Sequence, residues 1–153
     1  YIKNLEEKEL LKNLKIYAEK YKKKIEEKYE KSLMKSIHFL KNKAKKLEDI
    51  YENAQYIINE NIIINDQDAK LLDGTSKEII TDFLEDYEKL NIINKENLEK
   101  IIKNLISNNN TNFKGVGQPL RIALTGSKFG PGIYDIILSL NKNEVLKRLK
   151  MIN

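Results

Sequence analysis

The sequence predicts an all-α protein. Apolar residues recur at steps of three and four through most of the 153-residue chain, and residues that often begin helices precede several of these runs. No alternating apolar and polar run is long enough for a strand. Each apolar stripe is narrow, so several helices must share one core. The length suits one domain or two small ones.

In the first third of the chain the apolar spacing is helical throughout. Leucines and tyrosines between residues 5 and 21 indicate short amphipathic pieces, and the lysines and glutamates of residues 22–27 stand at spacings that pair charges on a helix. A longer stripe runs from Leu33 to Ala54 in steps of three and four, with Ser32 as the expected N-cap. We expect one long helix there, or two in series, with a lysine-rich face toward solvent.

Short capped helices are expected after residue 65. Asp66 is the expected cap of residues 67–72, and residues 75–78 (TSKE) form a capping-box pattern for the helix that carries Phe83 and Tyr87. Asn94 begins the next helix in this interpretation. Residues 107–112 then read as a polar loop because they hold no apolar side chain.

Glycine and proline cluster in one short segment. Five of the six glycines and both prolines lie between residues 115 and 132, in a chain that otherwise avoids them. The pattern predicts a Gly-rich turn, a helix beginning at Pro119, a loop over residues 126–130, and a helix with Pro131 in its first turn. Residues 141–144 form a capping pattern for a last helix. This segment also contains Arg121, one of only two arginines against 26 lysines.

Composition excludes several classes of protein. The chain has no cysteine and a single histidine, so it has neither a disulfide framework nor the residues of a thiolate or histidine-rich metal site. No apolar run approaches the ~20 residues of a membrane helix, which predicts a soluble protein without membrane contact. The chain starts at Tyr1, with no initiator methionine, and we expect it to be part of a longer protein.

Net charge changes sign along the chain. It is +5 over residues 1–56, −5 over residues 57–112 and +5 over residues 113–153. The two basic blocks would suit a phosphate backbone if their faces were continuous, although solvated helix faces that differ in charge explain the pattern equally well.

Three segments in the last quarter of the chain carry a resemblance to a known family. They are residues 118–127 (QPLRIALTGS), 130–136 (GPGIYDI) and 146–149 (LKRL). They strongly resemble the closing segment of bacterial-type glutamyl-tRNA synthetases, class I aminoacyl-tRNA synthetases that end in a P-L-R-x-A-L-T-G block, a P-G-L-[FY]-[DE]-I helix start and an R-L helix. Residues 1–3 and 40–47 are similar to upstream segments of that family, the latter to its basic L-x-x-R-x-x-T-L helix, so the resemblance covers essentially the whole chain.

The resemblance implies an α-helical, cage-like anticodon-binding region of two subdomains. We place these at residues 1–58, after the stem-contact region of the family, and at residues 59–153. The region itself is expected to hold no catalytic residue, metal or cofactor, while the parent enzyme would use ATP and Mg²⁺ to attach glutamate to tRNA. The implied partner is tRNA for glutamate, with tRNA for glutamine as a second candidate, and the chain is expected to be a monomer.

Seven residues are predicted to contact the anticodon. By their place in the family motifs these are Arg121, Lys43, Gly130, Pro131 and Ile133, and we add Lys128 and Phe129 from the same loop. Recognition of splayed anticodon bases requires a cationic fork, exposed backbone and flat apolar surfaces for stacking. Lys43 stands where arginine is usual in family members that charge only tRNA for glutamate, and lysine lacks the planar fork of arginine.

Two other interpretations stay open at this point. One is a free-standing helical RNA-binding module, which an upstream nucleotide-binding domain in the same reading frame would exclude. The other is a helical protein-interaction scaffold that uses the stripe from Leu33 to Ala54 and has no affinity for RNA.

Overall fold

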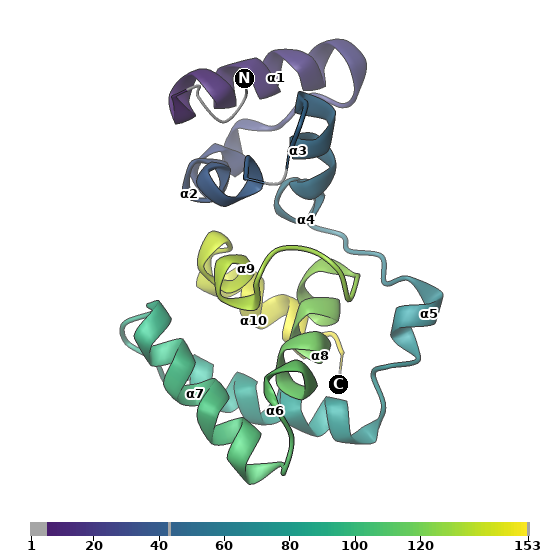
Figure 1. Ribbon diagram of the computed structural model, residues 1–153, viewed down its shortest axis with the longest axis vertical. Coiled ribbons are helices and arrows are strands. Elements are labelled where there is room, and N and C mark those ends of the chain that lie inside the picture. Colours follow the sequence, from purple (N-terminus) through teal and green to yellow (C-terminus); the bar gives the residue numbers. More distant parts are fainter. Residues whose placement is uncertain (1–5, 43, 153) are drawn as a thin grey trace. The chain divides into compact units, whose positions relative to one another are not determined.

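The computed structural model describes residues 6–42 and 44–152. These residues form ten α-helices and one 3-10 helix, and none of them lies in a β-strand (Figure 1). The prediction of an all-α fold is confirmed. The elements are α1 (Glu7–Tyr21), η2 (Glu27–Tyr29), α2 (Glu30–Leu40), α3 (Leu47–Asn53), α4 (Gln55–Ile58), α5 (Asp66–Ala69), α6 (Gly74–Glu88), α7 (Lys95–Asn108), α8 (Phe113–Thr125), α9 (Ile133–Ser139) and α10 (Lys142–Lys150).

The chain divides into two compact units, Tyr1–Asn61 and Ile62–Asn153, called unit 1 and unit 2 below. The boundary between residues 58 and 59 that we drew from the sequence stays a prediction about subdomains. In unit 1, α1 packs against both α2 and α3. The core of this unit is apolar and includes Leu10, Leu14, Leu33, Ile37 and Ile50, each fully buried.

Three predictions for unit 1 are wrong in detail. Residues 22–26 are not helical, because the chain leaves α1 after Tyr21 in a path that buries Ile25 at 4% exposure. Ser32 is not an N-cap. The 3-10 turn η2 leads directly into α2 at Glu30, and Ser32 lies inside the helix, where its carbonyl accepts a hydrogen bond from the Ser36 hydroxyl (2.6 Å).

The stripe from Leu33 to Ala54 is divided between separate helices, α2 and α3. Residues 41–46 are not helical in the part that is described, so the basic helix expected over residues 40–47 is also wrong. The Asp49 carboxylate explains the new start, since it accepts hydrogen bonds from the backbone N–H groups of Lys45 (2.9 Å) and Lys46 (3.1 Å). These bonds lower the pKa of Asp49.

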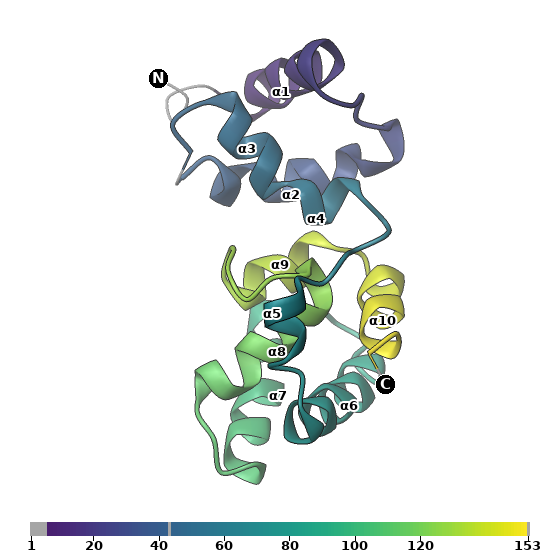
Figure 2. The same cartoon turned by 90° about the vertical axis from the view of Figure 1, so that its right-hand side faces the viewer.

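Unit 2 is built around α8, which contacts α6, α7, α9 and α10 (Figure 2). The predicted core pair Phe83 and Tyr87 is confirmed, with both side chains fully buried and their rings stacked at 5.5 Å. N-caps at Asn94 and Asn141 are also confirmed, because each side chain accepts a bond from a backbone N–H three residues on (2.8 Å in both).

Three helix starts in unit 2 differ from the sequence prediction. Asn65 rather than Asp66 caps α5, and Asp73 rather than Thr75 caps α6 by accepting from the Ser76 N–H (2.8 Å). The third is α8, which begins at Phe113 and continues through Pro119, where the sequence suggested a turn and then a helix start. The cause is Asn112, whose side chain accepts from the Gly115 N–H (2.9 Å) and begins the helix six residues earlier than expected.

The predicted loop after α8 is present, but α9 begins at Ile133 with Gly132 as its N-cap, two residues beyond Pro131. Among the described residues, no helix has the length and apolar character to cross a membrane. The same residues contain no group of three or more histidine or acidic side chains placed to hold a metal ion.

Candidate nucleic-acid interface

The loop between α8 and α9, residues 126–132, has a backbone that only glycine readily adopts at two positions. Gly126 ends α8 with φ +89° and Gly130 has φ +143°. At Gly126 a Cβ atom would also lie 2.5 Å from the Ile63 carbonyl oxygen, so any side chain would displace the neighbouring backbone. The Asn65 N–H donates to the Gly126 carbonyl (3.1 Å). Residues 63–65 therefore hold the start of the loop.

Arg121 holds the rest of this loop. Its Nε–H donates to the Pro131 carbonyl and its Nη1 donates to the Lys128 carbonyl, each at 3.1 Å. The guanidinium is half-buried in doing so, and this burial lowers the pKa of Arg121. A guanidinium carries five N–H donors, so these two bonds leave others for a ligand. Arg121 thus shapes the loop from the α8 side and still presents a cation there.

Asp68, in α5, also contributes a hydrogen bond to the loop. Its side chain is only 6% exposed, and its Oδ2 accepts from the Lys128 N–H at 3.1 Å. The two residues are sixty positions apart in sequence. Sequence reasoning missed Asp68 because no local pattern links it to the loop; its only visible property is its position in a short acidic helix.

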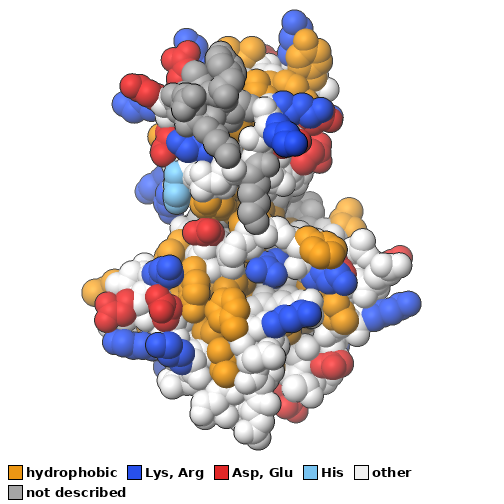
Figure 3. All heavy atoms as spheres, viewed as in Figure 1, with side chains coloured by type: hydrophobic (Ala, Val, Ile, Leu, Met, Phe, Trp, Pro, Cys, Tyr) orange, Lys and Arg blue, Asp and Glu red, His pale blue; other side chains and the backbone are white. Residues whose placement is uncertain are grey.

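Beside the loop lies a hollow of about 390 Å³, called the α8 hollow below. Its walls are formed by Phe113, Lys114, Gly117, Gln118 and Arg121 of α8 and by Lys128 and Phe129 of the loop. Phe113 is 46% exposed and Phe129 is 74% exposed. None of the residues that line the hollow carries a carboxylate. Figure 3 shows one face of unit 2, on which hydrophobic side chains stand beside cationic and acidic ones.

The α8 hollow brings together only some of the predicted site residues. Arg121, Lys128 and Phe129 line it, while Gly130 is exposed and Pro131 half-buried in the adjoining loop. Ile133 is 1% exposed, so its side chain belongs to the core of unit 2. Lys43 lies outside the described residues. Contact of any of these residues with a base stays a prediction.

Four wall residues were missed in the sequence, namely Phe113, Lys114, Gly117 and Gln118. Residues 113, 117 and 121 stand four apart, so they share one face of α8. That spacing would have indicated the missing residues, but only with the helix begun at Phe113. Because the sequence prediction began this helix at Pro119, it assigned the residues before Pro119 to a Gly-rich turn and not to α8.

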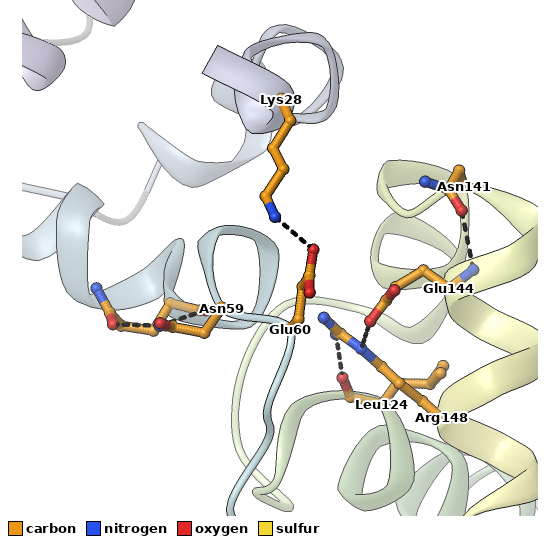
Figure 4. A network of polar contacts seen from close by, with 8 residues as sticks. Lys28, Asn59, Glu60, Leu124, Asn141, Glu144 and Arg148 are labelled. Carbon is orange, nitrogen blue, oxygen red and sulfur yellow. Dashed lines mark hydrogen bonds and ion pairs between the residues drawn. The ribbon is translucent and has the colours of Figure 1, made fainter. Parts of the chain in front are cut away.

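The second arginine, Arg148, lies in a different setting (Figure 4). It is 4% exposed, its Nε is 2.8 Å from Glu144 Oε1, and its Nη1 donates to the Leu124 carbonyl at 2.7 Å. Arg148 therefore joins α10 to the last turn of α8. This cation is used inside unit 2 and is not presented to solvent.

Comparison with protein families gives a match to the model described as "Anticodon binding domain", over residues 8–152. The chain belongs to the anticodon-binding domain family. Two relatives are a glutamate–tRNA ligase of Pelagibacter ubique, 54% identical over 149 residues, and glutamate–tRNA ligase 2 of a Chelativorans species, 32% identical over 128 residues. The matches cover 97% and 83% of this chain but only 32% and 27% of those proteins.

This member of the anticodon-binding domain family thus spans about a third of the length of the curated relatives that it matches. Among solved structures it is similar to a glutamate tRNA ligase from Elizabethkingia meningosepticum, with a TM-score of 0.82 and 18% identity, over 99% of this chain and 30% of that one. A glutamate-tRNA synthetase from Elizabethkingia anophelis gives a TM-score of 0.77 at the same identity. At that identity these likenesses establish the fold.

Proposed function

We propose that this chain is the anticodon-binding part of a glutamate–tRNA ligase and binds the anticodon stem-loop of tRNA for glutamate. The observation that carries the proposal is the α8 hollow. Its cations Lys114, Arg121 and Lys128 stand beside two exposed phenylalanines, next to a loop fixed by Arg121 and Asp68. The relatives support glutamate as the amino acid that the complete enzyme attaches, since those named above are glutamate–tRNA ligases.

The chemistry of the hollow fits an anticodon better than a duplex. Anticodon bases are unpaired and splayed, so a protein can stack them on aromatic side chains and read their edges with amides, guanidinium groups and loop backbone. A duplex hides those base faces. The rigid loop also has little conformational entropy to lose on binding, which favours affinity and discrimination.

In this proposal the chain contributes positioning and selection, and the chemistry takes place elsewhere in the protein. The complete enzyme would join glutamate to tRNA with ATP and Mg²⁺, acting as a cytoplasmic monomer. Binding the anticodon would place the distant acceptor end of the tRNA at the active site, and a wrong anticodon would lose binding energy. Lysine rather than arginine at position 43 supports a less strict reading of one base, so tRNA for glutamine is a second proposed partner.

A binding titration with the 153-residue chain tests the proposal. The probes are stem-loops that share one stem sequence and carry a glutamate anticodon, a glutamine anticodon or an unrelated anticodon. We expect tighter binding of the first than of the third, with affinity that falls as salt rises. Equal binding of the first and third stem-loops, or no binding of any at low salt, would contradict the proposed function. The glutamine stem-loop reports how strict the reading is.

A further inference from the structure

We infer that Asp68 is a positioning residue for anticodon discrimination: its carboxylate, together with Arg121, fixes the backbone at Lys128 in the conformation that distinguishes one anticodon from another. The inference rests on the proposed function and deepens it, because it assigns part of the specificity to a residue of α5 that binds the loop backbone and not the RNA. None of the family motifs quoted above contains Asp68.

Both backbone polar groups of Lys128 are bound by charged side chains. The Lys128 N–H donates to Asp68 Oδ2, and the Lys128 carbonyl accepts from Arg121 Nη1, each at 3.1 Å. The anion thus meets the donor and the cation meets the acceptor, so both hydrogen bonds are charge-assisted and stronger than bonds between neutral groups. Because peptide units are planar, these two bonds fix the chain on either side of Lys128.

The burial of Asp68 is the second reason. Asp68 is the only buried carboxylate among the residues that the structure describes, at 6% exposure. Burial of a carboxylate is unfavourable unless the group accepts hydrogen bonds or stands beside a cation. The Lys128 N–H supplies such a bond from a position sixty residues further along the chain. This buried charge is therefore directed at the backbone of the loop.

The segment that carries Asp68 is itself fixed to the loop by Asn65. The Asn65 N–H donates to the Gly126 carbonyl at 3.1 Å, while the Asn65 side chain accepts from the Gln67 N–H at 2.8 Å and caps α5. One residue thus anchors the segment at the start of the loop and begins the helix that carries Asp68. Residues 65–68 therefore bind the loop at two points, Gly126 and Lys128.

A fixed loop backbone should matter more for discrimination than for general affinity for RNA. Bases are distinguished by directional contacts to their edges, whereas phosphate contacts carry no sequence information. A correct anticodon gains its specific contacts only with a loop that is already in place. Release of the backbone at Lys128 should therefore weaken binding of the correct anticodon and leave binding of a wrong one almost unchanged.

The ratio of two affinities tests the inference. The 153-residue chain and its variants Asp68→Ala and Asp68→Asn are each titrated with the glutamate stem-loop and with the stem-loop of an unrelated anticodon. We expect Asp68→Ala to lower the ratio of the two affinities about fivefold, as for the net loss of one hydrogen bond. Asp68→Asn keeps a side-chain oxygen that can accept from the Lys128 N–H, so it should recover most of this loss.

Asp66→Ala is the matched control for charge. Asp66 lies in the same helix and is exposed, and none of the loop bonds described above involves it. Its substitution removes one negative charge, which should raise the affinity for both stem-loops alike and leave their ratio unchanged. Urea denaturation of every variant identifies conditions in which all of them are folded, and the titrations are made under those conditions.

An unchanged ratio in Asp68→Ala, with or without a loss of stability, would overturn the inference and leave the proposed function standing. An equal fall of the ratio in Asp68→Asn or in Asp66→Ala would also overturn it, because the negative charge and not the placed acceptor would then be responsible. Failure of the wild-type chain to distinguish the two stem-loops would instead contradict the proposed function itself.

Discussion

Each unit of this protein has a hollow lined by cations, and the two differ in what accompanies the positive charge. One hollow of unit 1 is lined by Lys23, Lys24 and Lys28 but also by Glu26 and Glu60. Lys28 pairs with Glu60 at 2.8 Å (Figure 4) and with Glu26 at 3.3 Å. These hydrogen bonds, first to Glu60 and then to Glu26, raise the pKa of Lys28. The α8 hollow has three cations, no lining carboxylate and two exposed phenylalanines.

This difference shows why counting lysines is a poor guide to an RNA site in this chain. Unit 1 is rich in lysine, yet Lys15, Lys22, Lys28, Lys41 and Lys46 all stand within ion-pair distance of glutamates. A cation that already has a carboxylate beside it attracts a phosphate less. The available positive charge is better judged by its partners than by its amount.

The largest change in stability is expected from substitution of Arg148, a buried cation whose partners lie inside unit 2. Arg148→Ala leaves Glu144 and the Leu124 carbonyl without their buried partner, so the free energy of unfolding should fall by about 3 kcal/mol. Urea denaturation measures this. Arg148→Lys is the matched control, because it keeps the charge and one donor and should recover part of the loss. A change below about 0.5 kcal/mol in Arg148→Ala would show that this arginine does not join α10 to α8.

Arg121 has N–H donors that form no hydrogen bond with the loop carbonyls, so its substitution should weaken RNA binding. Arg121→Ala should weaken binding of the anticodon stem-loop by about 1–3 kcal/mol, the range of bidentate base contacts. Arg121→Lys should recover little, since one ammonium does not reproduce the fork that spans the Lys128 and Pro131 carbonyls. Unchanged binding of Arg121→Ala at low salt would remove Arg121 from the site.

Asp68 should act on the same loop from the other side. Asp68→Ala removes the acceptor of the Lys128 N–H, which should weaken stem-loop binding by about 1 kcal/mol and speed hydrogen exchange at the Lys128 amide. Asp68→Asn keeps an oxygen in that place and should behave more like the wild type. Exchange at Lys128 that does not change in Asp68→Ala would show that Asp68 does not hold the loop.

The smallest effects compare single lysines of the two hollows. Lys128→Ala should lower stem-loop affinity at low salt and reduce its salt dependence, because it removes a cation whose ammonium forms no ion pair within the described residues. Lys28→Ala should leave both the affinity and the free energy of unfolding nearly unchanged, since the Lys28 ammonium is exposed and already paired. Equal losses of affinity in the two variants would break the comparison between the units.

The sequence predicted those parts of the fold that depend on neighbouring residues. Asn94 and Asn141 were recognised as caps because the backbone group that each one binds lies three residues away. Asn112 was not predicted as an N-cap because it lies in an asparagine-rich run, and Pro119 is a residue type that often begins a helix. The first two turns of α8 were therefore not predicted as helix, and the wall residues in them were not predicted as site residues. Asp68 was not predictable from any local pattern, because its partner Lys128 is brought to it only by the packing of unit 2.

The family motifs indicated the α8–α9 loop as the candidate site, but they did not indicate which atoms of its residues are engaged within the fold. Arg121 was expected to read a base, and the structure gives two of its donors to the loop carbonyls. Ile133 was expected at the site, and its side chain is in the core. Placing a residue in a motif does not say which of its atoms face solvent, since that depends on helices far away in the sequence.

The central claim is that the unpaired cations of the α8 hollow, and not the paired lysines of unit 1, face the phosphates of the anticodon loop. The most direct test is the salt dependence of stem-loop binding for the double variant Lys114→Ala/Lys128→Ala beside the variant Lys28→Ala. We predict that the slope of log affinity against log salt falls by about 2 in the double variant and is unchanged in Lys28→Ala. An unchanged slope in the double variant, or a reduced one in Lys28→Ala, would contradict the account.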